Sequence, residues 1–333
     1  MNKRNKTSKI AEDKMKIQGK LNAEEKTIQK RDPKMLSTIG TMDVGPVDFK
    51  ARVSEHEGDI MALATRDVVT LPPTTTIMGA IKTMTSKGFR RVPITDAGTN
   101  RLEGIVTSVD VIDFLGGGDR NLLVSKKFNG NLLAAVNAEV REIMQQDVAY
   151  LHEDASIADT FRIMIQRNTG CITILNNDNR VLAICTERDF MALVAGVYAN
   201  KSIGEYMSTK VKTAPSSTTI DEAAKIMVRQ GFRRLPVVKD SILIGIITAS
   251  DIMNFLGSGD AFNKLITGNI REAFDQPISS LISRDVVWAS SDMDLGNAAA
   301  LMVEKNVGSL PIIDDGTLCG ILTEQDFLRA MSK

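Results

Sequence analysis

Residues 104–119 read GIVTSVDVIDFLGGGD, and residues 245–260 repeat this stretch as GIITASDIMNFLGSGD. Upstream, FRRVP at residues 89–93 returns as FRRLP at residues 232–236. The second copy follows the first after 141 residues in the longer stretch and after 143 residues in the shorter one. The chain of 333 residues therefore contains two copies of a unit of about 140 residues.

Each copy divides again, because the pattern Thr-x-x-Asp follows a short apolar run four times. The four tetrads are Thr107/Asp110, Thr186/Asp189, Thr248/Asp251 and Thr323/Asp326. Apolar patterns of helical period lie upstream, at residues 77–84, 157–164, 220–227 and 295–302. Strand-like segments precede these helices, at residues 67–71, 147–151, 210–214 and 285–289. Two β-rich stretches come before each tetrad and a second helix comes after it, so each quarter predicts the order β-α-β-β-α.

The predicted fold class is α/β (α+β), with the four quarters paired into two modules. A unit of about 55 residues buries its apolar faces poorly alone, so each should need a neighbour. The predicted boundaries are a basic flexible tail at 1–34, an N-terminal extension at 35–56, repeat 1 at 57–118, a linker helix with repeat 2 at 119–196, repeat 3 at 197–258, and a linker helix with repeat 4 at 259–333.

Four β-α-β-β-α units that each end in an apolar run with T-x-x-D resemble cystathionine-β-synthase (CBS) domains. The resemblance covers about residues 57–333, and repeat 2 departs slightly because its run reads AICTERDF. The arrangement is similar to two Bateman modules, as in the gamma subunit of AMP-activated protein kinase and in stand-alone archaeal proteins with four CBS repeats. The resemblance implies adenosine ligands bound in clefts between paired repeats.

The tetrads allow two interpretations. A threonine N-cap with an acidic residue three positions later is a helix capping box, which needs no ligand. In CBS domains, however, the tetrad binds the ribose and phosphate of adenosine ligands. A helix N-terminus attracts phosphate, and an aspartate can accept hydrogen bonds from a ribose diol. We expect all four pairs to bind ligand, and we keep the capping interpretation for any site that proves empty.

The arginine pairs are the second candidate feature. They are Arg90/Arg91 in repeat 1 and Arg233/Arg234 in repeat 3, each at the start of a predicted strand. Successive strand residues point to opposite faces, so one arginine of each pair should face the cleft, where a guanidinium suits phosphate. The alternative is a solvated surface pair. Repeats 2 and 4 have Gly170-Cys171 and Gly308-Ser309 instead, which predicts unequal sites.

The adenine ring should stack beside the first strand-like segment of each repeat. The candidates at equivalent positions are Thr70, Tyr150, Thr213 and Trp288. Ordinary core or rim packing is the alternative role for these four residues.

Composition narrows the class of protein. Lys plus Arg and Asp plus Glu both number 41, which argues against a surface built wholly for nucleic acid or anionic membrane. Cys171, Cys185 and Cys319 lie in apolar stretches and are expected to be buried thiols in a reducing compartment. The two histidines have no partner at metal-ligand spacing, so we expect no metal, no catalytic residue and no required cofactor. No apolar run approaches the about 20 residues of a membrane span, and we expect a cytoplasmic protein.

The N-terminal segment differs in charge from the rest. Residues 1–34 hold eleven Lys/Arg and five Asp/Glu, so residues 35–333 carry the compensating negative charge. The tail is either solvated or a contact for nucleic acid or an acidic partner. Residues 35–56 should form an extended segment that packs on the first module.

These patterns favour a non-catalytic regulatory or sensor protein that binds AMP, ADP, ATP or S-adenosylmethionine. Ligand-dependent rearrangement of a repeat pair would then modulate an unidentified protein partner or a homodimer. The alternative function is a nucleic-acid-associated protein that uses the basic tail, with the repeats as a sensor. Residues 1–56 are too short and too polar for a catalytic domain, so we expect no enzyme.

Overall fold

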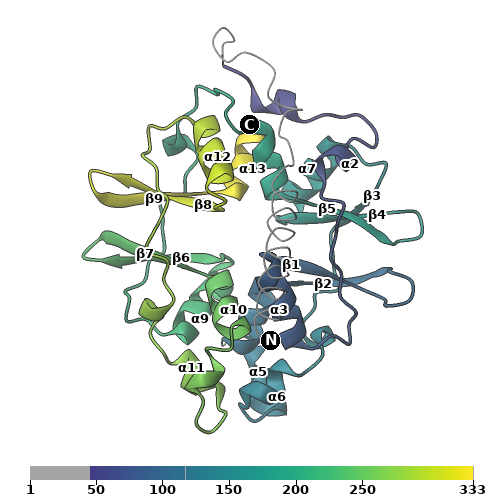
Figure 1. Ribbon diagram of the computed structural model, residues 1–333. Helices are drawn as coiled ribbons and strands as arrows, with labels where there is room; N and C mark the ends of the chain where they lie inside the picture. Colours follow the sequence, from purple (N-terminus) through teal and green to yellow (C-terminus); the bar gives the residue numbers. More distant parts are fainter. Residues whose placement is uncertain (1–45, 117, 333) are drawn as a thin grey trace, which may run out of the picture. The chain divides into compact units, whose positions relative to one another are not determined.

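The computed structural model describes residues 46–116 and 118–332. The predicted tail at 1–34 lies outside the described residues, and so do residues 35–45 of the predicted extension. Residues 46–333 form one compact unit, which Figure 1 shows coloured along the chain.

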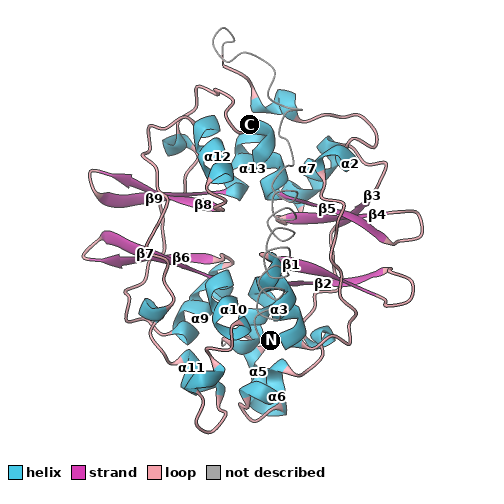
Figure 2. Cartoon of the chain, in the orientation of Figure 1, coloured by secondary structure: helices cyan, strands magenta, loops and turns pink. Residues whose placement is uncertain are grey.

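The four repeats share one order of elements, a helix, an antiparallel strand pair and a second helix (Figure 2). Repeat 1 contains α3 (Ile77–Lys87), β1 (Arg91–Thr95), β2 (Leu102–Thr107) and α4 (Ser108–Leu115). Repeat 2 contains β3 (Tyr150–His152), α7 (Ile157–Gln166), β4 (Cys171–Leu175), β5 (Val181–Thr186) and α8 (Glu187–Val194). Repeat 3 contains α9 (Ile220–Gln230), β6 (Arg234–Lys239), β7 (Ile242–Thr248) and α10 (Ala249–Gly257). Repeat 4 contains α12 (Leu295–Glu304), β8 (Ser309–Asp314), β9 (Thr317–Thr323) and α13 (Glu324–Ser332).

Short helices connect the repeats and precede them. The α-helical ones are α2 (Ile60–Leu63), α5 (Asn121–Lys127), α6 (Leu132–Val136) and α11 (Ile270–Phe274). The 3-10 helices are η2 (Phe49–Arg52), η3 (Val140–Glu142), η4 (Ile203–Glu205), η5 (Phe262–Lys264) and η6 (Ile278–Ser280).

Local signals explain where the first helices begin and end. Thr76 caps α3 by accepting a hydrogen bond from the backbone N–H of Gly79, and Thr219 caps α9 in the same way. Both helices end at a glycine with positive φ, Gly88 at 68° and Gly231 at 70°. Local sequence signals therefore mark both ends of these two helices.

The predicted first strand of each repeat is regular only in repeat 2, where β3 pairs in parallel with β4. In repeats 1, 3 and 4 the pairing shrinks to a single parallel bridge, at Leu71, Ala214 and Ala289 respectively. Proline follows the bridge directly in repeats 1 and 3, as Pro72 and Pro215, whereas repeat 4 has the same single bridge followed by Ser290. The parallel β segment is thus present in all four repeats but short in three.

Backbone bridges join repeat 1 to repeat 2, and repeat 3 to repeat 4. In the first pair, Thr65 pairs with Ile184 of β5 and Gln145 pairs with Ile105 of β2. The equivalent bridges in the second pair are Ser208–Ile321 and Ser283–Ile246. Repeats 1 and 2 therefore form module 1, and repeats 3 and 4 form module 2.

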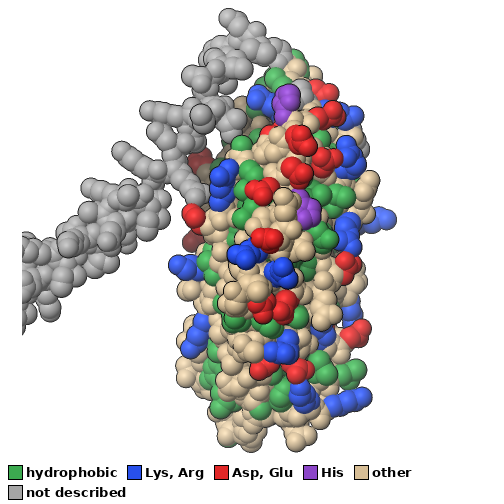
Figure 3. All heavy atoms as spheres, turned by 90° about the vertical axis from the view of Figure 1, so that its right-hand side faces the viewer, with side chains coloured by type: hydrophobic (Ala, Val, Ile, Leu, Met, Phe, Trp, Pro, Cys, Tyr) green, Lys and Arg blue, Asp and Glu red, His purple; other side chains and the backbone are tan. Residues whose placement is uncertain are grey.

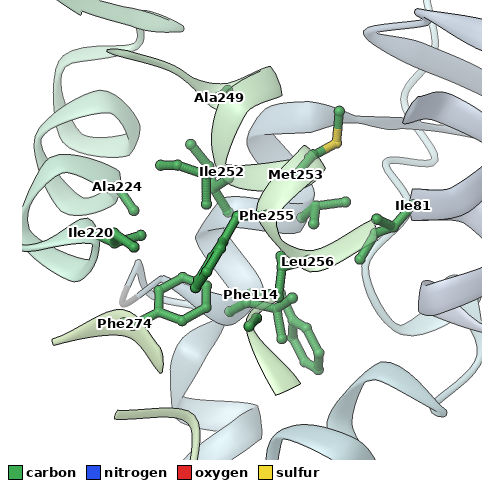
Figure 4. Packing of buried hydrophobic residues seen from close by; sticks show 14 of the residues in the cluster. Ile81, Phe114, Ile220, Ala224, Ala249, Ile252, Met253, Phe255, Leu256 and Phe274 are labelled. Atoms are coloured by element: carbon green, nitrogen blue, oxygen red, sulfur yellow. The ribbon is translucent and has the colours of Figure 1, made fainter. Parts of the chain in front are cut away.

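The hydrophobic cores join the repeats differently. One cluster combines α3 and α4 of repeat 1 with α9 and α10 of repeat 3; Figure 4 shows Ile81 and Phe114 together with Ile252 and Leu256 in this cluster. A second cluster combines repeat 2 with repeat 4 through α8, α12 and α13. Strand bridges thus build each module, whereas helix packing joins the two modules.

Two features of the structure concern possible binding to a membrane or to nucleic acid. No helix in the described residues is long and apolar enough to cross a bilayer. On the face shown in Figure 3, lysine and arginine side chains are interspersed with aspartate and glutamate. That face therefore offers no continuous basic stripe for a nucleic acid backbone.

Candidate functional site

All four predicted tetrads have the same internal geometry. The threonine backbone N–H and hydroxyl both donate to Oδ2 of the aspartate, at distances of 2.7–2.9 Å. The tetrads of repeats 1, 2 and 3 form complete capping boxes. The proton of the threonine hydroxyl is thus used inside the tetrad, and one carboxylate oxygen caps the helix.

The other carboxylate oxygen, Oδ1, distinguishes the four aspartates. At Asp110 it accepts hydrogen bonds from Arg120 Nη1 and Gln145 Nε2, both at 2.8 Å. At Asp326 it accepts one from Arg329 Nη1 at 3.1 Å. At Asp189 and Asp251 it has no hydrogen-bond partner among the described residues. Only the last two aspartates keep a completely free acceptor.

Burial raises the pKa of Asp189, Asp251 and Asp326 above the usual range. The hydrogen bonds from the tetrad threonine oppose this shift in each case. A carboxylate whose charge is costly to bury gains from further hydrogen-bond donors, and a ribose diol supplies two.

Three pockets lie at equivalent places, and we name them A, B and C. A tetrad threonine lines each of them, whereas the tetrad aspartate is a lining residue only in pocket C. Pocket A includes Thr186, pocket B includes Thr248 and pocket C includes Thr323. Their cavity volumes are about 240, 220 and 230 Å³ respectively. The similar size and position indicate one kind of site that occurs three times.

Each pocket is built by both repeats of one module. One repeat supplies the segment before its first helix and the start of its first hairpin strand, and the other supplies the end of its second strand with the tetrad. In pocket A, residues 65–69 and 88–93 of repeat 1 face residues 184–188 of repeat 2. In pocket B, residues 283–287 and 306–311 of repeat 4 face residues 246–250 of repeat 3. In pocket C, residues 208–212 and 231–236 of repeat 3 face residues 321–326 of repeat 4. A ligand in any pocket would therefore touch two repeats.

The fourth equivalent place, beside the tetrad of repeat 1, is filled by the chain itself. Ile105, Val148 and Cys171 pack there into a small cluster with exposed fractions of 5%, 9% and 8%. The isoleucines equivalent to Ile105 in the other repeats are partly exposed and line pockets A, B and C. We call this filled place the closed position.

The four predicted arginines converge between the modules, where two glutamates meet them. Arg90 Nη1 of module 1 lies 2.5 Å from Glu324 Oε2 of module 2. Reciprocally, Arg233 Nη2 of module 2 lies 3.1 Å from Glu187 Oε2 of module 1. Arg188 Nε also donates to Glu324, at 2.9 Å. Each module thus gives one buried carboxylate to an arginine of the other.

The second arginine of each pair has a different environment. Arg91 Nη1 donates to the carbonyl oxygen of Gly170. Arg234 has no hydrogen-bond or ion-pair partner among the described residues, and it lines both pocket B and pocket C. Burial, followed by the neighbouring charge of Arg233, lowers the pKa of Arg234 to about 9. Arg234 is therefore a poorly compensated cation that faces two pockets.

The glycines of repeats 2 and 4 leave room for these arginines. A Cβ atom at Gly308 would overlap Nη2 of Arg234 and lie 2.6 Å from Nη2 of Arg90. A Cβ atom at Gly170 would lie 2.9 Å from Oε2 of Glu187 and 3.0 Å from Nη2 of Arg91. The absence of arginine from the even repeats thus has a steric reason as well as an electrostatic one.

None of the four predicted adenine contacts is a lining residue of pocket A, B or C. Thr70, Thr213 and Trp288 each follow directly after a lining residue, and Tyr150 has the corresponding place beside the closed position. Tyr150 is 50% exposed and Trp288 is 54% exposed. A role in adenine binding stays a prediction for all four residues.

The sequence analysis missed the central glutamates. The second tetrad position reads Ser108, Glu187, Ala249 and Glu324 along the chain. Acids occur there only in the even repeats, whereas the arginine pairs occur only in the odd repeats. This alternation was visible in the sequence and indicated complementary charges, but the sequence does not show which repeats face each other.

The CBS domain family matches residues 58–117, 140–196, 203–258 and 278–333, which is more than half of the chain. Protein MJ1225 of Methanocaldococcus jannaschii is 40% identical over 266 residues, covering 79% of this chain and 95% of the relative. Its crystal structure, described as that of a proposed archaeal homolog of g-AMPK, aligns with a TM-score of 0.77 over 81% of this chain and 98% of that one, at 39% identity.

Two further proteins are similar to this chain, one in sequence and one in fold. A 33.4 kDa protein from the ribosomal RNA operon of Thermofilum pendens is 28% identical, covering 79% of this chain and 87% of the relative. A conserved protein from Pyrococcus horikoshii has the same fold, with a TM-score of 0.51 at 18% identity over 82% of this chain and 99% of that one.

Proposed function

Because the chain belongs to the CBS domain family, we propose that it is a non-catalytic regulatory protein that binds adenosine ligands in pockets A, B and C. The observation that carries this proposal is the threefold recurrence of one pocket, with a tetrad at one side and arginines at the other. Its likeness to MJ1225, a proposed homolog of g-AMPK, supports the same class of function.

The pocket lining supports a common orientation for the ligand. The free Oδ1 of Asp189 or Asp251 would accept the ribose hydroxyls, as an acidic residue does in dinucleotide-binding folds. Valines at equivalent positions, Val68, Val286 and Val211, offer an apolar surface for the base. The arginines between the modules would then meet the 5′ end of the ligand.

Regulation would follow from the position of the pockets between two repeats. A ligand that touches both repeats favours the arrangement in which its contacts are complete. A partner that prefers this arrangement then binds more tightly when ligand is present, and by linkage the partner tightens ligand binding by the same factor. A partner protein, or a second copy of the chain, would bind the surfaces that this rearrangement changes.

We expect Asp251→Asn to weaken adenosine-ligand binding at pocket B about tenfold, since the loss of one hydrogen bond to a charged group costs about 1.5–3 kcal/mol. The asparagine carbonyl can still accept the capping hydrogen bonds, so the helix should remain. Calorimetry of the full chain with AMP, ADP, ATP and S-adenosylmethionine measures the effect.

Asp159→Asn is the matched control, because Asp159 forms the same kind of capping box with Ser156 away from the three pockets. It should leave every affinity unchanged. If none of the four ligands binds the unmodified chain at millimolar concentration, the proposed function is wrong.

A further inference from the structure

The three pockets differ in the charge of their lining. Pocket A is lined by three arginines and three carboxylates: Arg90, Arg91, Arg188, Asp67, Glu187 and Glu324. Pocket B is lined by three arginines and one carboxylate: Arg90, Arg233, Arg234 and Asp285. Pocket C is lined by five cations and three carboxylates: Lys210, Lys212, Arg233, Arg234, Arg329, Glu187, Glu324 and Asp326. Only pocket A is electrically balanced.

The cations of pocket A are also already engaged. Arg90 and Arg188 both bind Glu324, and Arg91 donates to the Gly170 carbonyl. Glu324 itself is only 2% exposed, so a phosphate that drew Arg90 away would leave a buried carboxylate with less compensation. Phosphate binding in pocket A would therefore disturb an existing buried ion pair.

One donor in pocket A remains unused. Nη2 of Arg188 is buried and has no hydrogen-bond partner among the described residues. The rest of this guanidinium is held by Glu324 and by the side-chain oxygen of Asn306. The two free N–H groups on Nη2 of an already paired arginine suit neutral acceptors, such as a ring nitrogen or a hydroxyl oxygen.

Pockets B and C contain what pocket A lacks. Both are lined by Arg234, which has no partner among the described residues. Pocket C adds Lys210 and Lys212, at the positions where pocket A has Asp67 and Val69. The guanidinium of Arg234 is compensated only by the more distant charges of Glu324 and Glu187, and phosphate oxygens could bind it without breaking an existing ion pair.

We propose that pocket A selects adenosine ligands that carry no net negative charge, whereas pockets B and C select phosphorylated ones. Asp67 and Lys210 set this difference between pockets A and C, where they occupy equivalent positions. Pocket B has Asp285 at that position and differs from pocket A through Arg234. The inference rests on the proposed function, because it assigns the charge class of ligand to each of the same three pockets.

The test is calorimetry of the full chain with adenosine, AMP and ATP, before and after single blocks of each pocket. Asp189→Asn should weaken adenosine binding about tenfold and leave ATP binding unchanged. Asp251→Asn and Asp326→Asn should each weaken ATP binding about tenfold and leave adenosine binding unchanged. Asp159→Asn should change neither.

A second set of variants keeps the test independent of the aspartates. Ile184→Phe, Ile246→Phe and Ile321→Phe each add volume to a partly exposed side chain that lines pocket A, B or C respectively. Each should block the same ligand as the aspartate variant of its pocket. Agreement between the two sets shows that the loss comes from the pocket and not from misfolding.

The reversal of charge tests the selecting residues directly. Asp67→Lys should make pocket A bind ATP at least tenfold more tightly than in the unmodified chain. Lys210→Asp should weaken ATP binding in pocket C about tenfold.

The inference is overturned if adenosine binding survives both Asp189→Asn and Ile184→Phe, or if ATP fills all three pockets with equal affinity. Either result leaves the proposed function intact, whereas failure of adenosine, AMP and ATP to bind at all contradicts both.

Discussion

Replacement of Glu324 by glutamine is expected to lower the free energy of unfolding by about 3 kcal/mol at pH 7. Burial alone would raise the pKa of this carboxyl group, but the charges of Arg90 and Arg234, the hydrogen bond from Arg90 and the charge of Arg188 lower it from 4.5 to about 2. Because Glu324 connects the two modules, its loss weakens the contact between them and not only one helix end.

The sign of the pH dependence follows from the lowered pKa of Glu324. The folded state binds this proton less readily than the unfolded state, so the stabilisation is complete above pH 4.5 and is lost as the pH falls through about 2. Asp189, Asp251 and Asp326 act in the opposite direction, because burial raises their pKa values. The informative quantity is therefore the difference between variant and unmodified chain at each pH.

Denaturant unfolding at several pH values between 2 and 7 measures this difference. The gap between Glu324→Gln and the unmodified chain should close as the pH falls below about 4. Glu304→Gln is the control, since Glu304 is exposed and paired only with its neighbour Lys305, and it should change stability little at any pH. Parallel stability curves for Glu324→Gln and the unmodified chain would show that the carboxylate does not stabilise the fold.

Replacement of Gly296 by alanine is expected to destabilise the fold by about 4 kcal/mol or more. Gly296 lies in the first turn of α12, and a Cβ atom there would overlap the backbone carbonyl oxygen of Val197. The amide of Gly196 also donates to the carbonyl of Gly296 at 2.8 Å, which holds the two backbones together. The two backbone segments cannot move apart to make room for a Cβ atom without breaking this hydrogen bond.

Thermal and denaturant unfolding of Gly296→Ala give the measurement. Gly204→Ala, in η4, is the control, because the nearest neighbour of its new Cβ atom would be Ser291 O at an ordinary 3.4 Å. This control should stay within about 1 kcal/mol of the unmodified chain. Helix propensity alone predicts that Gly296→Ala stabilises the helix by about 1 kcal/mol, so a stabilised variant would mean that the close approach to Val197 is absent.

The sequence predicted the repeated elements because their signals are local. Helical periodicity placed α3, α7, α9 and α12, and the tetrads placed the starts of α4, α8, α10 and α13. The family resemblance is confirmed by the matches to four CBS domains. The predicted first strands are regular only in repeat 2 and shrink to a single bridge in the other three, which no local signal predicted.

The state of each tetrad could not be predicted from the tetrad itself. Asp110 and Asp189 occupy the same motif, yet Arg120 and Gln145 saturate the first and leave the second free. These two side chains come from a linker and from the segment before repeat 2, and no local pattern connects them with Asp110. Whether the place beside a tetrad is open or closed therefore depends on which segments of the chain lie next to it in the folded structure.

The sequence by itself determined four repeats, their order of elements and the residue types gathered at equivalent positions, because periodicity and capping act over a few neighbouring residues. Only the tertiary structure decided that repeat 1 packs on repeat 3 and repeat 2 on repeat 4, and hence that Glu187 and Glu324 meet arginines of the opposite module. The charge of a pocket is the sum over side chains from distant parts of the chain. Their distances, and not their spacing in sequence, fix which arginines are compensated and which remain open to a ligand.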